Sequence, residues 1–298
     1  MKVLISGSSG LVGKDLCAFL IHQGHDVHKL IRDKAKLDDK SIYWNPETKE
    51  LNAIQLEGFD AVVHLAGENI AAKRWTKEQK TILRDSRIKS TRLLSEALAK
   101  LSHKPKVFIS VSAIGFYGDR PNEMLHEGAM PTKGDYLSGL CQDWEAAANV
   151  ARDSGIRVVH PRFGVILSPK GGAMSKLLIP FQLGLGGIIG SGKQVMSWIA
   201  LDDVIYALHY LLINDKISGP VNFTSPNSAT NAEFTKALGK ILSRPTIFPV
   251  PSFAAKLVFG EMADALLLSS TKAKPGMLLE AGFKFSYPKL EEALRHLL

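Results

Sequence analysis

The sequence predicts an α/β fold in which a doubly wound parallel sheet is followed by a smaller C-terminal substrate lobe. Two observations carry this prediction. Short apolar runs of strand length alternate with helical segments over residues 1–160, as in a parallel sheet that helices cover. The first apolar run, residues 3–5, ends in a Gly-x-x-Gly-x-x-Gly pattern that opens a helix. Together these features indicate a Rossmann-type sheet that binds a dinucleotide.

The turn after this first strand carries three glycines with separate roles. Gly7 lets the chain turn sharply out of the strand, and Gly10 lets backbone N–H groups approach a pyrophosphate. Gly13 lets the helix pack closely on the sheet, and the helix N-terminus faces the anion. An ordinary βα turn is the alternative, which the helix and strand that follow disfavour. The residues expected to bind the cofactor here are Gly7, Ser9, Gly10, Leu11, Val12 and Gly13.

The end of the second strand, residues 26–31, distinguishes NAD from NADP. An acidic residue there would accept hydrogen bonds from the ribose 2′-OH of NAD. This strand is followed by Arg32, whose planar guanidinium suits a 2′-phosphate. A solvated surface arginine is one alternative, and Asp33 could take the ribose instead. The sequence favours NADP (NADPH) as the cofactor.

Composition and charge limit the possible classes of protein. The chain has 298 residues and a net charge of +8, with no apolar stretch of about 18 residues or more. Lys and Arg are scattered among acidic residues, which argues against nucleic acid and favours general attraction for an anionic cofactor. The cysteines, Cys17 and Cys141, and the histidines form no metal-ligand pattern, so no metal is expected. We expect a cytoplasmic monomer or homodimer that binds a small-molecule substrate and no membrane.

Further strands end in small or polar residues at the same edge of the sheet. Residues 61–65 form a third buried strand, and residues 107–110 form the next one. Open α/β sheets bind ligands at the carboxyl ends of their strands. The residues expected to contact the cofactor there are Leu65, Ala66, Gly67, Glu68 and Ser110.

The pattern of alternating strands and helices changes at Pro161. Residues 1–160, which end in a helix over 136–154 and a strand over 156–160, are predicted to form the NADP-binding domain. Residues 161–298, with glycine-rich connections and more prolines, are predicted to form mainly the substrate lobe. The segment near 200–225 is a candidate for return to the main sheet.

Several motifs resemble the extended short-chain dehydrogenases, the NAD-dependent epimerase/dehydratase family. The glycine motif, His64-Leu65-Ala66 and residues 112–119 match its landmarks in order. Longer matches resemble an atypical epimerase-like subgroup that has its own C-terminal domain; they include residues 65–70, Arg74-Trp75, residues 85–87, residues 171–174 and residues 279–283. This resemblance implies NADP contacts at Arg32, at the corner of residues 65–68, at Arg87 and near Phe163.

The catalytic residues depart from this family. Its members use a Ser or Thr together with a Tyr that is followed four residues later by Lys, whose charge lowers the tyrosine pKa. Here Tyr136 is followed at that position by Leu140, and Ser112 lies one residue before the expected hydroxyl position. Tyr136 is therefore expected to be protonated, or to be only a half-buried residue at the start of a helix. Tyr117 is a rival hydroxyl, and Lys193 is a candidate for the missing cation.

Two functions follow from these observations. The first is an NADP-dependent oxidoreductase or epimerase that acts on a small polar substrate, with Ser112 polarising an oxygen and Tyr136 or Tyr117 handling its proton. The second is a non-catalytic protein whose lobes respond to NADP(H) binding and are read by a partner. The missing lysine favours the second function, and the presence of a full substrate lobe favours the first.

Overall fold

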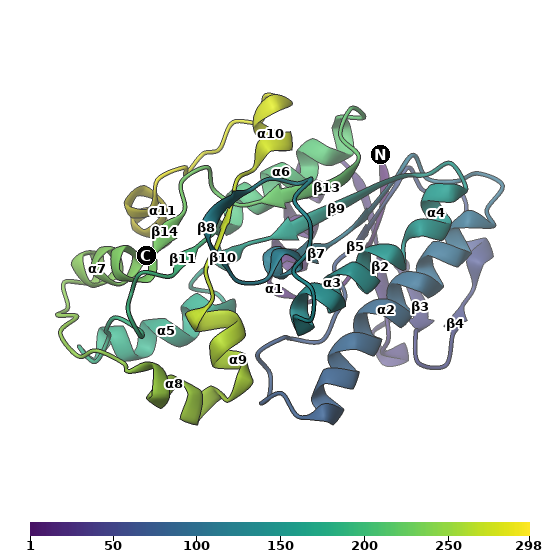
Figure 1. The fold of residues 1–298 in the computed structure, drawn as a ribbon. Coiled ribbons are helices and arrows are strands. Elements are labelled where there is room, and N and C mark those ends of the chain that lie inside the picture. The colour runs from purple at the N-terminus through teal and green to yellow at the C-terminus, as the bar shows by residue number, and fades with distance from the viewer.

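The computed structural model describes residues 1–298 and confirms the predicted α/β fold class (Figure 1). The central strands of the main sheet are parallel, and only β4 at one edge runs antiparallel to its neighbour. A short strand, β7 (Ser112–Ala113), pairs with β9 outside the main order. The order across the sheet is β13 (Gly219–Phe223), β9 (Arg157–Phe163), β6 (Val107–Ser110), β5 (Ala61–His64), β1 (Lys2–Ser6), β2 (Asp26–Ile31), β3 (Ser41–Asn45) and β4 (Glu50–Leu51).

The register of the central strands brings their carboxyl ends to one edge. Ser6 at the end of β1 pairs with Leu30 of β2 on one side and with His64 of β5 on the other. His64 pairs in turn with Ser110 at the end of β6. The residues that follow these strands, which include the glycine motif, therefore lie at the same edge of the sheet.

Helices cover both faces of the sheet. Helices α1 (Leu11–His22) and α6 (Leu201–Ile213) pack together on one face, over a core that includes Ile5, Leu16 and Leu208. The other face is covered by α2 (Lys77–Ala99), α3 (Tyr136–Ala146) and α4 (Asn149–Asp153). The single helix expected over residues 136–154 is divided, because the backbone N–H of Ala148 bonds to Glu145, three residues back, in a tighter turn.

The chain leaves the main sheet after β9 and returns to it at β13. Strand β9 continues through Pro161 to Phe163, and β13 pairs with it in parallel. Val221 faces Pro161 and Phe223 faces Phe163 in this register. The last strand of the sheet is thus contributed by residues that follow β10 (Val165–Leu167), α5 (Gly172–Gln182) and β12 (Trp198–Ala200).

The C-terminal lobe has a core of its own. Apolar residues of α5, α7 (Asn231–Leu242) and α11 (Leu290–Leu297) pack around Trp198, which is fully buried. A capping box of Thr230 and Glu233 opens α7.

The C-terminal lobe also contains a small sheet to which the N-terminal half contributes one strand. Its strand order is β14 (Ala229–Thr230), β11 (Val195–Met196), β15 (Thr271–Ala273) and β8 (Arg120–Leu125). The remaining helices are α8 (Ser252–Phe259), α9 (Glu261–Ala263) and α10 (Gly276–Glu280). None of the helices combines the length and apolar character that crossing a membrane requires.

Candidate cofactor and active site

The glycine motif requires glycine at two of its positions. Gly7 has a backbone φ of +71°, and a Cβ there would lie 2.8 Å from the backbone nitrogen of Ala66. A Cβ on Gly13 would lie 2.2 Å from the carbonyl oxygen of Gly7. Gly10 closes the turn by donating its N–H to that same carbonyl at 3.0 Å. Of the other loop residues, Ser9 is exposed, and Leu11 and Val12 are half-buried.

A fully buried histidine holds the corner at the end of β5. His64 Nδ1 lies 2.6 Å from Ser6 Oγ, and His64 Nε2 lies 3.2 Å from Ser90 Oγ. Because the Ser90 hydroxyl donates to the Ser86 carbonyl, we assign the imidazole proton to Nε2, so that Nδ1 accepts from Ser6. Ser6 Oγ also accepts the backbone N–H of Ala66 at 3.3 Å. Burial lowers the pKa of His64 to about 3, so a neutral imidazole fixes the backbone of the corner.

Arg87 of α2 holds the same corner through main-chain carbonyls. Its Nη2 donates to the carbonyl of Glu68 and its Nη1 to the carbonyl of Leu83, both at 3.0 Å. Ser86 adds a bond from the backbone N–H of Glu68 to its hydroxyl at 3.1 Å. Gly67 lies between them, where a Cβ would be 3.5 Å from Arg87 Cγ. The structure thus gives Arg87 and Glu68 a positioning role in the loop where cofactor contacts are predicted.

Arg32 and Asp33 have different surroundings at the end of β2. Arg32 is exposed, one residue beyond the strand, at the edge where Gly7 begins its turn. The Asp33 carboxylate accepts the backbone N–H of Ala35 at 3.1 Å and pairs with Lys36 at 3.2 Å. Asp33 is therefore engaged in its own short turn, whereas Arg32 is exposed, forms no ion pair and is the better candidate for a 2′-phosphate.

Two buried serine hydroxyls lack a hydrogen-bond partner. They are Ser110 at the end of β6 and Ser112 in β7. The hydroxyl of Ser112 lies near the Cys141 thiol, whose pKa is raised to about 12 by burial, so this thiol is neutral. Phe163, at the end of β9, is half-buried and packs against Phe223 with ring centres 5.5 Å apart. Buried unpaired hydroxyls are uncommon, and these two lie inside the protein at the ends of strands that reach this edge.

Tyr136 lies at the start of α3 and has a cation beside it that sequence spacing did not indicate. Its hydroxyl donates to the carbonyl of Lys80 at 3.1 Å, and the Lys80 ammonium lies 4.7 Å from the centre of its ring. Partial burial raises the pKa of Tyr136, so the phenol is neutral near pH 7. Leu140, at the position where the family has lysine, is 3% exposed. Lys193, the expected candidate for the cation, is exposed on a turn before β11.

Tyr117 is not available as the rival hydroxyl, which corrects the prediction made for it. Its side chain is fully buried. The hydroxyl donates to Asn222 Oδ1 at 2.7 Å and accepts from Arg162 Nη1 at 3.0 Å. Arg162 is also held by Glu145, and its guanidinium lies 3.4 Å from the centre of the Phe116 ring. Tyr117 therefore belongs to a polar network inside the protein, with both its donor and an acceptor position used.

The C-terminal lobe reaches the glycine motif and the loop after β5. A Cβ on Gly171, just before α5, would lie 3.4 Å from a methyl carbon of Leu11. The Lys176 ammonium in α5 donates to the carbonyl of Ala71 at 3.1 Å. These contacts place α5 beside the predicted cofactor loop, where a substrate lobe is expected.

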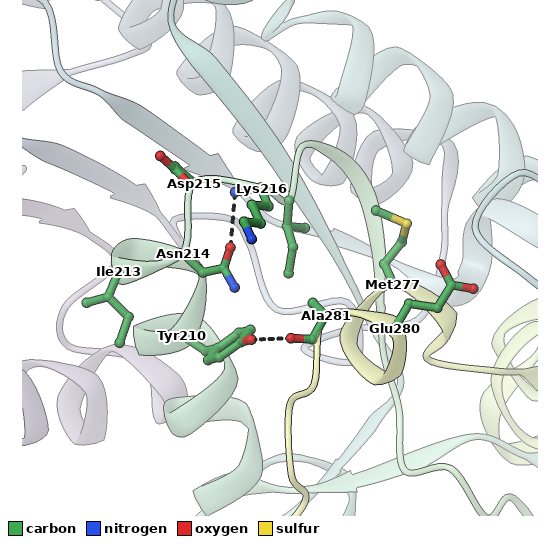
Figure 2. Close-up of a pocket in the computed structure, with 9 residues that line it drawn as sticks. Tyr210, Ile213, Asn214, Asp215, Lys216, Met277, Glu280 and Ala281 are labelled. Carbon is green, nitrogen blue, oxygen red and sulfur yellow. Dashed lines mark hydrogen bonds between the residues drawn. The ribbon is translucent and has the colours of Figure 1, made fainter.

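A separate groove lies at the opposite edge of the main sheet. It has a volume of about 680 Å³ and is formed between the end of α6 and α10. Figure 2 shows the Tyr210 hydroxyl bonded to the carbonyl of Ala281, and the side chain of Asn214 bonded to the backbone of Lys216. The residues from 213 to 217 precede β13, so this groove lies on the amino side of the strands. It is therefore separate from the predicted cofactor residues, which follow the carboxyl ends.

Comparison with known proteins supports the motifs found in the sequence. A family model described as the NAD dependent epimerase/dehydratase family matches residues 3–223. The chain belongs to this family. A second model, a domain of unknown function called DUF1731, matches residues 250–297. The family resemblance and the distinct C-terminal domain are both confirmed.

Relatives in this family match the chain over its full length. The epimerase family protein Mb2239 of Mycobacterium bovis is 44% identical, over 98% of this chain and 96% of its own. The human epimerase family protein SDR39U1 is 37% identical over 100% of both chains. A crystal structure of human SDR39U1 (isoform 2) with NADPH has a TM-score of 0.92, at 36% identity, and covers 100% of this chain and 99% of that one.

Proposed function

We propose that this family member binds NADP(H) at the carboxyl edge of its sheet and acts as an oxidoreductase or epimerase on a small polar substrate. The observation that carries the choice of cofactor is Arg32, which is exposed just after β2, the strand that pairs with β1, while Asp33 is engaged in its own turn. The human relative, which is similar over its full length, was crystallised with NADPH, and this supports the same choice.

The residues at this edge fit a dinucleotide. The backbone of Gly7 and Gly13 leaves no room for a Cβ, so the turn packs closely on the residues after β5 and α1 packs closely on the turn, the arrangement in which a helix N-terminus receives a pyrophosphate. The unpartnered hydroxyls of Ser110 and Ser112 supply donors that need an acceptor. The residues that would hold the cofactor are the loop of Gly7, Ser9, Gly10, Leu11, Val12 and Gly13, then Arg32, the corner of Leu65, Ala66, Gly67 and Glu68, and finally Arg87, Ser110 and Phe163.

When bound, such a cofactor gives or accepts a hydride at its nicotinamide ring. The residues of this chain handle the accompanying proton and the substrate oxygen. Ser112, whose buried hydroxyl lies beside the Cys141 thiol, would turn from that thiol to donate a hydrogen bond that polarises the oxygen. Tyr136, which is neutral near pH 7, would act as a proton donor rather than as a base. For this step its hydroxyl must turn from the carbonyl of Lys80 toward the substrate.

The alternative function is a non-catalytic NADP(H)-responsive protein. The buried Leu140 favours it, since no lysine follows Tyr136 at the family spacing. In that case cofactor binding would select one arrangement of the lobes, through contacts such as that of Lys176 with the carbonyl of Ala71, and a partner would recognise this arrangement.

Thermal unfolding with NADP⁺, NADPH, NAD⁺ and NADH tests the cofactor proposal. A ligand that binds only the folded state raises its apparent stability. We expect the phosphorylated pair to raise the midpoint more than the other pair, and Arg32→Ala to remove that difference. Arg295→Ala, an exposed change in α11, is the matched control and should keep it. No shift with any of the four nucleotides would contradict both the enzyme and the sensor. Equal shifts in the unchanged protein would contradict the role of Arg32.

A further inference from the structure

Lys80, in the first turn of α2, lies between a tyrosine and a carboxylate from different parts of the fold. Its ammonium is 4.7 Å from the centre of the Tyr136 ring, and its carbonyl accepts the Tyr136 hydroxyl at 3.1 Å. The same ammonium lies 2.6 Å from both carboxylate oxygens of Glu261. Tyr136 starts α3 over the main sheet, whereas Glu261 starts α9 in the C-terminal lobe. One side chain therefore joins the candidate proton donor to the other lobe.

Charges of both signs surround the Tyr136 phenol. Partial burial is the main cause that raises its pKa, and Arg87 is the main one that lowers it. Glu261 raises the pKa further, because a negative neighbour disfavours the phenolate. The charged and titratable groups that face the phenol are Lys80, Arg84 and Arg87 of α2, Cys141 of α3 and Glu261 of α9.

The two parts of Lys80 act in opposite directions on the Tyr136 proton. A hydroxyl that donates to a carbonyl keeps its proton, so the bond to the Lys80 backbone favours the neutral phenol. An ammonium beside the ring favours the phenolate, because opposite charges attract. Glu261 cancels that charge while the ion pair is formed. The balance between the two forms therefore depends on where Glu261 lies.

Glu261 follows a glycine whose backbone conformation few other residues adopt. Gly260 has a φ of +61°, and a Cβ there would lie 3.1 Å from Arg74 Nη2. The Arg74 side chain thus lies against the backbone of the residue that precedes Glu261. Residues with a side chain rarely adopt this φ, so a substitution at Gly260 strains the backbone that leads into α9 and positions the carboxylate that binds Lys80.

We propose that Lys80 is a positioning residue that serves Tyr136 in place of the absent lysine, and that Glu261 makes its effect depend on the docking of the C-terminal lobe. With α9 docked, Tyr136 keeps its proton and acts as a hydrogen-bond donor. With α9 withdrawn, the free ammonium favours the phenolate, the form that accepts a proton. This inference rests on the proposed function, since it matters for catalysis only where Tyr136 meets a substrate.

The titration of Tyr136 tests this proposal directly. The full chain is labelled with 3-fluorotyrosine, its ¹⁹F NMR spectrum is followed with pH, and the Tyr136 signal is identified by its loss in Tyr136→Phe. Glu261→Gln should move the titration to lower pH, and Lys80→Met should move it to higher pH. Gly260→Ala should act in the same direction as Glu261→Gln, although it removes no charge.

A second ion pair between helices provides the control. Lys240 of α7 lies 3.0 Å from Glu291 of α11, and both side chains are exposed. Glu291→Gln should leave the Tyr136 titration unchanged. Titrations that coincide in the unchanged protein, Glu261→Gln and Lys80→Met would overturn the proposal.

The measurement separates this inference from the proposed function, because it needs neither cofactor nor substrate. If no nucleotide stabilises the protein, the proposed function fails, while the titration still decides the role of Lys80. If Tyr136→Phe abolishes turnover and the titration does not respond to Lys80 or Glu261, the proposed function stands and this inference fails.

Discussion

The guanidinium of Arg162 and the carboxylate of Glu145 form a bidentate ion pair, in which Nε and Nη2 each lie 2.8 Å from a carboxylate oxygen. The Arg162 side chain is 3% exposed and that of Glu145 is 13% exposed. The pair joins β9 to α3, and through Arg162 it also orients Tyr117. An arginine in these surroundings needs its counter-ion, because a buried charge without a partner is costly.

Removing the counter-ion should therefore destabilise the fold. Glu145→Gln leaves Arg162 buried without a negative partner, and we expect it to lower the free energy of unfolding by about 3 kcal/mol. The control is Asp143→Asn on the same helix, which breaks an ion pair with Arg84 in which both side chains are about half exposed. That change should cost less than about 1 kcal/mol. Urea unfolding measures both, and equal losses would show that the buried pair has no special role.

Gly13→Ala should weaken both the fold and the cofactor site. The new Cβ would lie 2.2 Å from the carbonyl of Gly7, so α1 or the loop must move. We expect NADPH affinity to fall by at least about tenfold, which is roughly 1.4 kcal/mol of binding free energy. Gly139→Ala in α3 has open space around its Cβ and should leave affinity unchanged. Titration of NADPH fluorescence checks this, and retained affinity in Gly13→Ala would contradict the assignment of the loop.

The stability of the protein should depend on pH through His64. Burial lowers the pKa of this imidazole from 6.5 to about 3. Below pH 6.5 the unfolded chain therefore binds a proton that the folded protein does not. The free energy of unfolding should fall as the pH drops from 6.5 toward 3, by up to about 1.4 kcal/mol per pH unit from this group.

His64→Gln removes that titration and should flatten the pH dependence, although it lowers stability at pH 7. A smaller slope should remain, because burial also lowers the pKa of His160. Urea unfolding at pH 7, 6 and 5 measures both slopes. If the two proteins have parallel profiles, His64 is not the group that titrates.

Tyr136→Phe and Ser112→Ala should lower turnover once a substrate has been found by screening with NADPH. We expect a loss of about a hundredfold for Tyr136→Phe, which removes the proton donor, and a similar loss for Ser112→Ala. NADPH affinity should stay within about twofold for Tyr136→Phe. Tyr117→Phe is the control, since it removes a buried hydrogen bond and should act on stability. Full turnover in both hydroxyl variants would favour the non-catalytic alternative.

Local patterns were sufficient to predict the fold class and the glycine loop. The turn from β1 into α1 depends on neighbours a few residues apart, and the geometry of Gly7 and Gly13 follows from their spacing. The strands end where the apolar runs end, so the edge that carries Ala66 and Ser110 could be predicted as well.

The surroundings of the tyrosines could not be predicted in this way. The cation beside Tyr136 is Lys80, which comes from another helix, 56 residues earlier in the chain. Tyr117 is buried by contacts with Asn222, 105 residues later, and with Arg162, 45 residues later. No local spacing encodes such contacts, because they arise only when separate elements pack together. The same holds for the division between α3 and α4, where no glycine or proline marks the break.

The return of the chain to the main sheet has a consequence for how the protein is made. Strand β9 emerges from the ribosome well before its neighbour β13, which ends at Phe223. Until then the backbone of β9 presents an unpaired edge to other chains. The nucleotide-binding half therefore cannot finish folding during synthesis until residues 161–223 have been translated. A gene fragment that stops at residue 160 should therefore yield a protein that aggregates. For the same reason, residues 1–160 of one relative should not fold when joined to residues 161–298 of another as if the two were independent domains.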